Sequence, residues 1–253
     1  MPARLGVGTI RYCLGLMAAV LLVSIPLCAH AGVEAVRHNI KELIPKIISA
    51  YGGEDAIKRA KRVYAAGDIT AFMRNDKGTY TRYMERDRKL RVETAYASGS
   101  SELRILNGKT GWRRMDKTQV LESRDFQLLA MVYQYKQLDM PYGLLTGQYN
   151  IADEGIITLN GAEVEVLDVE DGEGPPMKIY VDIKSSLIVR TEGYFFVKGN
   201  LTSLGADFSD FKKVDGVILP FRIINSGSGQ LIGETIIKKY KINPAMDESL
   251  FRP

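Results

Sequence analysis

Cysteine and histidine are scarce in this chain of 253 residues, which has two of each. Both cysteines, Cys13 and Cys28, and one histidine, His30, lie near the amino terminus. Removal of that segment would leave no thiol and would leave His38 as the sole histidine. Such a chain cannot form a disulfide, a thiolate nucleophile or a zinc site with two histidines, and a Ser-His-Asp triad would depend on His38. We therefore expect no enzymatic activity, no cofactor and no metal.

The first 31 residues have the pattern of a secretory signal peptide. Arg4 and Arg11 give a basic start, and Ala29-His30-Ala31 has the small-x-small pattern of a cleavage site. A membrane-anchoring helix is the alternative, but the apolar run between them is short and Pro26 interrupts it. We expect a cleaved signal peptide over residues 1–31 and a periplasmic location.

The charges of the chain nearly balance, with a net charge of +4 and 25% charged residues. A nucleic-acid-binding domain usually carries a concentrated basic patch, so we expect no nucleic-acid partner. With 45% hydrophobic residues, the chain is long enough to bury one sizeable core. No linker or tandem repeat divides it, which favours a single domain over residues 32–253.

The longest helix-like stretch extends from Ser123 to Gly147 and lies between two groups of strand-like runs. Ser123 is suited to cap the helix, apolar residues recur at spacings of three and four, and Pro141, Gly143 and Gly147 are expected to end it. Further apolar residues widen the stripe, so we expect the helix to be buried on more than one side. Shorter helices are predicted over residues 36–51 and 54–61.

About five strand-like runs precede this helix and six or seven follow it. In Lys89–Tyr96, for example, Leu90 and Val92 alternate with polar residues. The turns between runs, such as Asn107-Gly108 and Asn160-Gly161, are short, so neighbouring runs should pair antiparallel. A flat sheet of so many strands would curl. We predict a mainly β, α+β fold: a strongly curved, antiparallel open β-barrel of about eleven strands, with helices forming a lid.

Two acidic patterns resemble functional motifs but fit ordinary structure better. Asp207, Asp210 and Asp215 lack the close spacing of a calcium-binding loop. Glu163 and Glu165 share one face of a predicted strand, and two acids on the outer face of an alternating strand are common. We therefore expect neither a calcium site nor a glycosidase carboxylate pair.

Apolar and aromatic side chains are numerous on the predicted inner faces. A bent sheet with a helix across its mouth encloses a concave apolar surface, which either fills with side chains or stays open for an apolar ligand. Methionine suits such a lining because it adapts to ligands of varied shape. By strand face and helix stripe, we predict that the hydrophobic cavity and its lid are lined by Ile69, Leu90, Val92, Leu103, Ile105, Trp112, Phe126, Leu129, Met131, Tyr133 and Met140.

Five short motifs, in this order along the chain, resemble the LolA/LolB-like superfamily of periplasmic outer-membrane lipoprotein-sorting proteins. The likeness covers residues 51–253. The motifs are Tyr51-Gly52-Gly53 before a short helix and a strand with Gly67, Asn107-Gly108-Lys109-x-Gly111-Trp112, Tyr180-Val181-Asp182, Val214-Asp215-Gly216-Val217-x-Leu219-Pro220, and Ile242-Asn243-Pro244-x-Met246-Asp247-x-x-Leu250-Phe251.

The resemblance implies an open, curved barrel with a helical lid and a hydrophobic cavity, in which acyl chains are carried without chemistry. It implies a donor in the inner membrane and an acceptor at the outer membrane as partners. It also implies an inward arginine that ties the lid to the barrel. The sequence leaves this role open among Arg74, Arg82, Arg91 and Arg104.

The expected function is therefore that of a soluble periplasmic carrier, which binds the acyl chains of a lipoprotein or another lipid in its cavity and delivers them towards the outer membrane. The superfamily also includes envelope-stress sensors. A regulatory protein that binds lipoprotein and contacts a membrane regulator is thus the alternative, and the shared fold cannot choose between the two.

Overall fold

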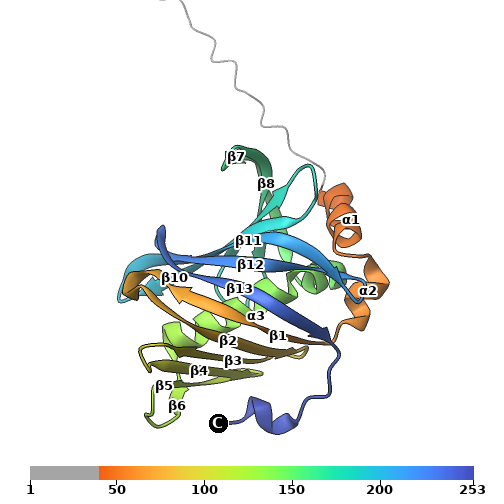
Figure 1. Cartoon of the computed structure of the whole chain (residues 1–253). Helices are drawn as coiled ribbons and strands as arrows, with labels where there is room; N and C mark the ends of the chain where they lie inside the picture. Colours follow the sequence, from red (N-terminus) through yellow and green to blue (C-terminus); the bar gives the residue numbers. More distant parts are fainter. Residues whose placement is uncertain (1–39) are drawn as a thin grey trace, which may run out of the picture. The chain divides into compact units, whose positions relative to one another are not determined.

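The structure is a computed structural model that describes residues 40–253. One antiparallel sheet of 13 strands forms the wall of the protein (Figure 1). The strand order is β6-β5-β4-β3-β2-β1-β13-β12-β11-β10-β9-β8-β7. The sheet therefore consists of two meanders, which join where β1 pairs with β13. The strands are β1 Arg62–Ala71, β2 Asp76–Glu85, β3 Lys89–Tyr96, β4 Ser101–Asn107, β5 Thr110–Met115, β6 Leu121–Ser123, β7 Asn150–Leu159, β8 Ala162–Glu170, β9 Met177–Asp182, β10 Ile188–Val197, β11 Asn200–Val214, β12 Val217–Gly227 and β13 Gln230–Ile242.

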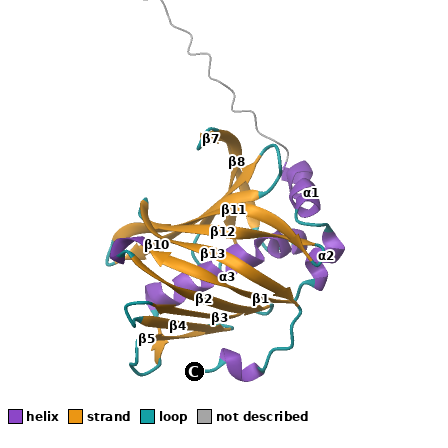
Figure 2. Cartoon of the chain, in the orientation of Figure 1, coloured by secondary structure: helices purple, strands orange, loops and turns teal. Residues whose placement is uncertain are grey.

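Within residues 40–253, three α-helices accompany the sheet (Figure 2). They are α1 Ile40–Ala50, α2 Glu54–Arg59 and α3 Asp125–Thr146, and two 3₁₀ turns are η1 Phe72–Arg74 and η2 Glu248–Phe251. Among residues 40–253, no helix is both long and apolar enough to span a membrane. The expected signal peptide and His38 lie outside the described residues.

The predicted fold class is confirmed: the structure is mainly β, and its curved antiparallel sheet does not close. Six strands precede α3 and seven follow it. The sequence missed β6, because a strand of three residues next to a helix shows too little alternation to be recognised.

Helix α3 connects the two edge strands, β6 and β7, and runs along the concave side of the sheet (Figure 1). It contacts β3, β4 and β5 in one meander and β10 in the other. Its buried residues are spread around its circumference, as the apolar pattern predicted, and include Met131, Val132, Tyr133, Tyr135 and Met140. A helix with sheet on several sides needs this distribution.

The ends of α3 differ from the prediction. The N-cap residue is Arg124, which makes no side-chain capping bond, and Ser123 is a buried residue of β6. The helix continues through Pro141 and Gly143, and only Gly147, at φ 68°, ends it. Proline is tolerated here at the cost of one backbone hydrogen bond. Tertiary contacts on both meanders thus outweigh the local helix-ending signals.

Buried apolar side chains form two main clusters, one on each side of α3. The first joins α1 and α3 to β8, β9 and β10 and includes Ile47 and Met140. The second joins α3 to β1, β2, β3, β4 and β13 and includes Leu90 and Met131. The interior beside α3 is therefore filled in two places, and the cavities described below lie between them.

Gly67 lies at the seam between the two meanders. The pairing of β1 with β13 shifts register between Ala66 and Gly67. A Cβ atom on Gly67 would lie 1.9 Å from the carbonyl oxygen of Ile236, so a side chain at this position would push β13 away. A bulge of this kind increases the local bend, which helps the sheet to curve around α3.

Candidate ligand-binding cavities

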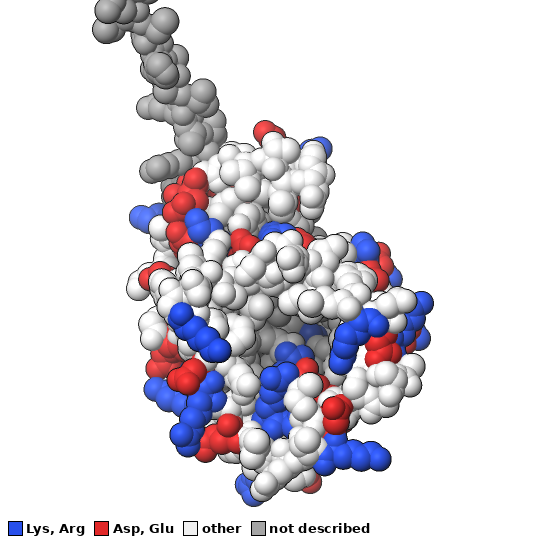
Figure 3. All heavy atoms as spheres, turned by 90° about the vertical axis from the view of Figure 1, so that its left-hand side faces the viewer, with Lys and Arg blue, Asp and Glu red and all other residues white. Residues whose placement is uncertain are grey.

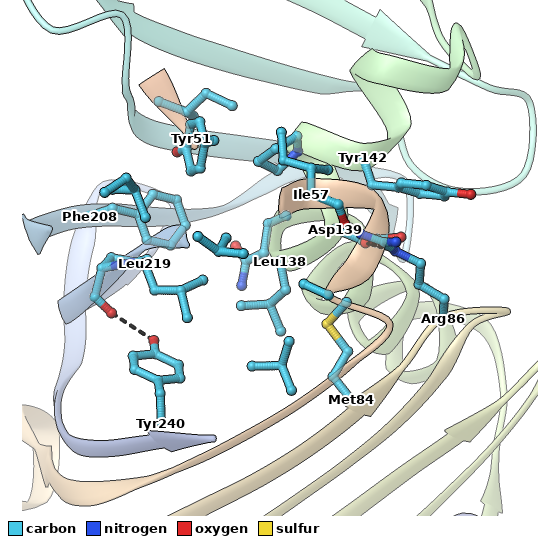
Figure 4. Close-up of a pocket in the computed structure, with 18 of the residues that line it drawn as sticks. Tyr51, Ile57, Met84, Arg86, Leu138, Asp139, Tyr142, Phe208, Leu219 and Tyr240 are labelled. Atoms are coloured by element: carbon cyan, nitrogen blue, oxygen red, sulfur yellow. Dashed lines mark hydrogen bonds and ion pairs between the residues drawn. The ribbon is translucent and has the colours of Figure 1, made fainter. Parts of the chain in front are cut away.

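An apolar cavity of about 70 Å³ lies between the second half of α3 and the strands around the seam (Figure 4). In Figure 4, the labelled side chains of Tyr51, Leu138, Phe208, Leu219 and Tyr240 surround a common space. The full lining is Tyr51, Ile57, Ala60, Val63, Arg82, Met84, Arg86, Gln137, Leu138, Asp139, Pro141, Tyr142, Ile188, Phe208, Val217, Ile218, Leu219, Pro220 and Tyr240. The short α2, the end of β2 and the start of β12 thus close this space with mainly apolar groups.

A second, more polar cavity of about 250 Å³ lies between the first half of α3 and the hairpin ends of the sheet. Its lining is Ile69, Thr70, Ala71, Tyr80, Arg82, Tyr96, Glu102, Arg104, Ala130, Tyr133, Gln134, Gln137, Leu204, Gly205, Ile223, Asn225, Ser226, Ile232, Gly233 and Thr235. Figure 3 views the molecule from the side of these hairpin ends and shows a hollow with Lys or Arg atoms inside it. The polar cavity is therefore the one that faces this hollow.

Arg82 and Gln137 line both cavities and so mark the boundary between them. Arg82 lies on β2 on the same face as Tyr80 and Met84, because side chains alternate along a strand. Its side chain is almost wholly buried, at 3% exposure, and its Nε atom has no hydrogen-bond partner. The Gln137 amide oxygen accepts a hydrogen bond of 3.1 Å from Thr191 Oγ1 on β10.

An ion pair closes one end of the apolar cavity (Figure 4). Arg86, the residue after β2, lies with Nε 3.3 Å from Asp139 Oδ1 on α3 and with its guanidinium 3.6 Å from the centre of the Tyr142 ring. It also donates to the carbonyl oxygens of Ile57 and Lys58 at the end of α2. Burial raises the pKa of Asp139 to about 6, against the opposing effect of the Arg86 charge.

A second ion pair, between Lys136 and Asp171, fixes the middle of α3 to the loop between β8 and β9. Both side chains are nearly buried. Burial lowers the pKa of Lys136. Burial opposes ionisation of Asp171 as well, yet hydrogen bonds from Lys136 and from the Glu173 backbone hold the pKa of Asp171 below its ordinary value. These contacts restrain the helix that forms one wall of both cavities.

Solved structures with similar folds include three that this chain matches over most of its length. An outer-membrane lipoprotein-sorting protein domain from Vibrio parahaemolyticus is 13% identical, with a TM-score of 0.52 over 85% of this chain and 97% of that one. A DUF1329 family protein from Desulfovibrio piger (TM-score 0.54) and a LolA superfamily protein from Nitrosomonas europaea (TM-score 0.50) are each 14% identical, over 84% of this chain and 97% of theirs. This chain has the LolA-like fold. The resemblance inferred from the sequence is therefore confirmed for the fold.

No family profile matches the sequence, and no curated protein matches it significantly. The LolA-like fold thus rests on the arrangement of strands and helices in space. Function is not settled by a shared fold.

Two of the predicted lining residues, Ile69 and Tyr133, line the polar cavity of this LolA-like fold. The Tyr133 hydroxyl also lies 3.0 Å from Thr191 Oγ1. Leu90, Val92, Met131 and Met140 are buried in the filled clusters, Phe126 stacks edge-on against Phe195, and Leu129 is 38% exposed. None of this second group lines either of the two cavities. A role of any of these residues in ligand binding stays a prediction.

The sheet face predicted for three of the lining residues was wrong: Leu103, Ile105 and Trp112. In the register of β3 and β4, Leu90 pairs with Leu106 and Val92 pairs with Arg104, so Leu103 and Ile105 point to the convex side. Trp112 pairs with Ile105 and shares that side. Leu103 and Ile105 are buried because η2 covers β3 and β4 from outside. These three residues cannot line a cavity on the concave side.

Four residues that line the apolar cavity were not predicted from the sequence: Arg82, Gln137, Leu138 and Tyr142. A signal for Arg82 was present, because Thr79–Arg86 places it on one face with Tyr80 and Met84. A buried arginine between apolar neighbours is uncommon and often functional. The α3 residues had no such signal, because an all-round apolar helix does not reveal which side faces a cavity.

The four arginines considered for the link between barrel and lid have different roles. Arg104 Nη1 donates to Gln134 Oε1 of α3 at 3.0 Å, and Arg82 lies at the boundary of the cavities. Arg74 stacks on Tyr96, and Arg91 pairs with Glu93 on the convex side. The ionic contact with α3 is made by Arg86, which was not among the four.

The expectation for Glu163 and Glu165 was wrong in one respect. Glu165 is 1% exposed and lines a small cavity with Glu42 and Lys46 of α1, so its strand face is covered and not solvated. Strand alternation alone cannot show that a distant helix covers a face.

Proposed function

We propose that this chain is a periplasmic carrier that binds the hydrocarbon chains of a lipid or lipoprotein between α3 and the sheet and delivers them towards the outer membrane without chemical change. The observation that carries the proposal is an apolar cavity between α3 and the seam strands that shares two lining residues, Arg82 and Gln137, with a polar cavity beside a surface hollow. A slot with an apolar end and a polar end suits an amphiphile.

Burial of the chain would supply the affinity. Each buried CH₂ contributes about 0.8 kcal/mol, so a long acyl chain contributes on the order of 10 kcal/mol before ordering costs. The apolar cavity, at about 70 Å³, is smaller than the roughly 300 Å³ of a common small-molecule pocket. A long chain would therefore enter only if α3 moved outward. The contacts of Arg86 and Lys136 would then regulate entry and release.

Apolar side chains at the hairpin ends support delivery to a membrane or an acceptor. The turn between β1 and β2, the β12–β13 hairpin and the β10–β11 hairpin are neighbours in the sheet, and Ala71, Leu204 and Gly233 beside them line the polar cavity. We call the four most exposed apolar residues at these ends the hairpin rim. They are Met73 at 76% exposure, Phe196 at 80%, Leu201 at 63% and Leu231 at 56%. An apolar group of this kind beside a ligand opening is a common contact site for partners.

The proteins of similar fold support a role in delivery towards the outer membrane, since one of them is described as an outer-membrane lipoprotein-sorting domain. We propose an inner-membrane donor and an outer-membrane acceptor as partners on this basis. No step of the proposed cycle makes or breaks a covalent bond.

The test is native purification followed by lipid extraction and mass spectrometry, together with titration of an apolar fluorescent probe. We expect a co-purified lipid, and saturable probe binding that the extracted lipid reverses. Vesicle-to-vesicle transfer of that lipid would support the carrier. A protein that carried no lipid and bound no probe would contradict the proposal, and retention of a membrane regulator without any lipid transfer would favour the sensing alternative.

A further inference from the structure

Arg82 occupies the place where the two cavities meet. It is held there from both sides, because its neighbours across the sheet are Ala65 on β1 and Val92 on β3, both fully buried. Tyr240 on β13 continues the same row as the partner of Ala65. The guanidinium thus projects from a packed wall towards α3 and lines the polar and the apolar cavity at once.

No carboxylate among the described residues lies within 4.0 Å of the Arg82 guanidinium. Its polar neighbours include the hydroxyl groups of Tyr80 and Tyr240, which are not anionic partners. The Tyr240 hydroxyl itself donates to the carbonyl oxygen of Pro220 at 2.7 Å. Burial of a cation without a counter-charge is energetically unfavourable, and a bound anion would reduce this cost.

The nearby arginines show how unusual this is. Arg86 lies 3.3 Å from Asp139, and Arg104 lies 3.6 Å from Glu102. Both are more exposed than Arg82, yet each has a carboxylate within the described part of the chain. The least exposed of the three is the one left without an anion.

We propose that Arg82 binds the anionic headgroup of a single-chain amphiphile whose hydrocarbon chain lies in the apolar cavity. This inference rests on the proposed function and specifies its ligand class. The headgroup chemistry is a carboxylate or a phosphate, because a guanidinium binds either one through two parallel N–H···O bonds. Because the apolar cavity of about 70 Å³ must widen even for one chain, a single chain requires the smallest outward movement of α3. Gln137 would add a donor through its amide nitrogen, since its amide oxygen already accepts a hydrogen bond from Thr191 and the residue lines both cavities.

The test compares three ligands with the same acyl chain on delipidated protein, by displacement of an apolar fluorescent probe. They are palmitate, palmitoyl lysophosphatidate and the uncharged monopalmitoylglycerol. We expect both anions to bind at least about tenfold tighter than monopalmitoylglycerol. Palmitate and lysophosphatidate distinguish the sources: tighter binding of palmitate indicates a free fatty acid, and tighter binding of lysophosphatidate indicates a phospholipid product.

Arg82→Gln should remove this preference. Affinity for both anions should fall about tenfold or more while affinity for monopalmitoylglycerol changes less than about twofold, because only the anions use the charge. Arg82→Lys keeps the charge but not the planar fork of the guanidinium. Its affinity for both anions should lie between those of the wild type and Arg82→Gln. The matched control is Arg222→Gln on β12, whose arginine pairs with Glu234 and lines neither cavity.

The apparent melting temperature of the empty protein separates ligand binding from a structural role. Arg82→Gln removes a buried charge that has no carboxylate partner, so this temperature should stay equal or rise. Equal binding of charged and uncharged ligands by the wild type, or an equal loss for all three in Arg82→Gln, would overturn the proposal and leave the carrier function intact. If none of the three ligands displaced the probe, the ligand class proposed here would be overturned, while binding of the probe itself would still support the carrier function.

Discussion

The Arg86 guanidinium at the end of β2 lies 3.3 Å from the Asp139 carboxylate on α3. Both side chains are 12% exposed, and the Tyr135 hydroxyl donates to the other carboxylate oxygen of Asp139 at 3.1 Å. The contact joins the sheet, the end of α2 and the helix that borders both cavities. A change in this pair should therefore affect stability and ligand exchange together.

Arg86→Gln should destabilise the fold by about 2–3 kcal/mol at pH 7, because it leaves a largely buried carboxylate without its cation and frees two carbonyl groups of α2. Urea unfolding followed by circular dichroism measures this. The control is Arg62→Gln, whose arginine is 42% exposed and lies 3.7 Å from Glu85. It should cost less than about 1 kcal/mol. Equal costs for the two variants would show that the Arg86 pair adds no stability of its own.

The stability of the wild type should fall relative to that of Asp139→Asn as the pH rises from 4 to 7. Burial raises the pKa of Asp139 from 3.8 to about 6, so the folded state binds this proton more tightly than the unfolded state. The contribution of this proton to stability is complete below the unfolded value and is lost as the pH rises through the folded value. The loss should approach about 3 kcal/mol.

Urea unfolding at a series of pH values, with both proteins in the same buffers, checks the Asp139 prediction. Parallel curves for the two proteins, or a wild type that gains stability relative to Asp139→Asn over this range, would contradict it.

Leu138→Trp should block the apolar cavity. Leu138 lines this cavity from α3, and an indole there would occupy the space of a ligand chain. Probe affinity should fall about tenfold. Leu129→Trp in the same helix is the matched control, because Leu129 is 38% exposed and lines neither cavity. Its affinity should change less than about twofold. The reverse ranking would favour the lining inferred from the sequence over the cavity seen in the structure.

Polar substitution of the hairpin rim should slow transfer and leave binding intact. Met73→Ser combined with Phe196→Ser removes two of its most exposed apolar side chains, which touch neither cavity. Loss of this apolar contact area should reduce the rate of lipid transfer to acceptor vesicles about tenfold. Equilibrium affinity for the probe should stay within about twofold. An unchanged transfer rate would remove the rim from the delivery step.

Much of the wall could be predicted from the sequence because it depends on local rules. Alternation in runs such as Lys89–Tyr96 and short turns such as Asn107-Gly108 set strand type and antiparallel pairing. The apolar circumference of α3 indicated burial on several sides. The order of short motifs along the sequence, including those with Gly67 and Trp112, indicated the LolA-like fold.

The sequence by itself determined strands, turns, the central helix and the fold class, since each follows from neighbours within a few residues. Only the tertiary structure decided which face is concave: alternation separates Ile105 from Arg104 but cannot say which one points to α3. It also decided that Arg82, Gln137 and Tyr240 meet, and that Arg86 reaches Asp139. These contacts join segments far apart in the chain, and the pairing of β13 with β1 places Tyr240 in the same row as Arg82.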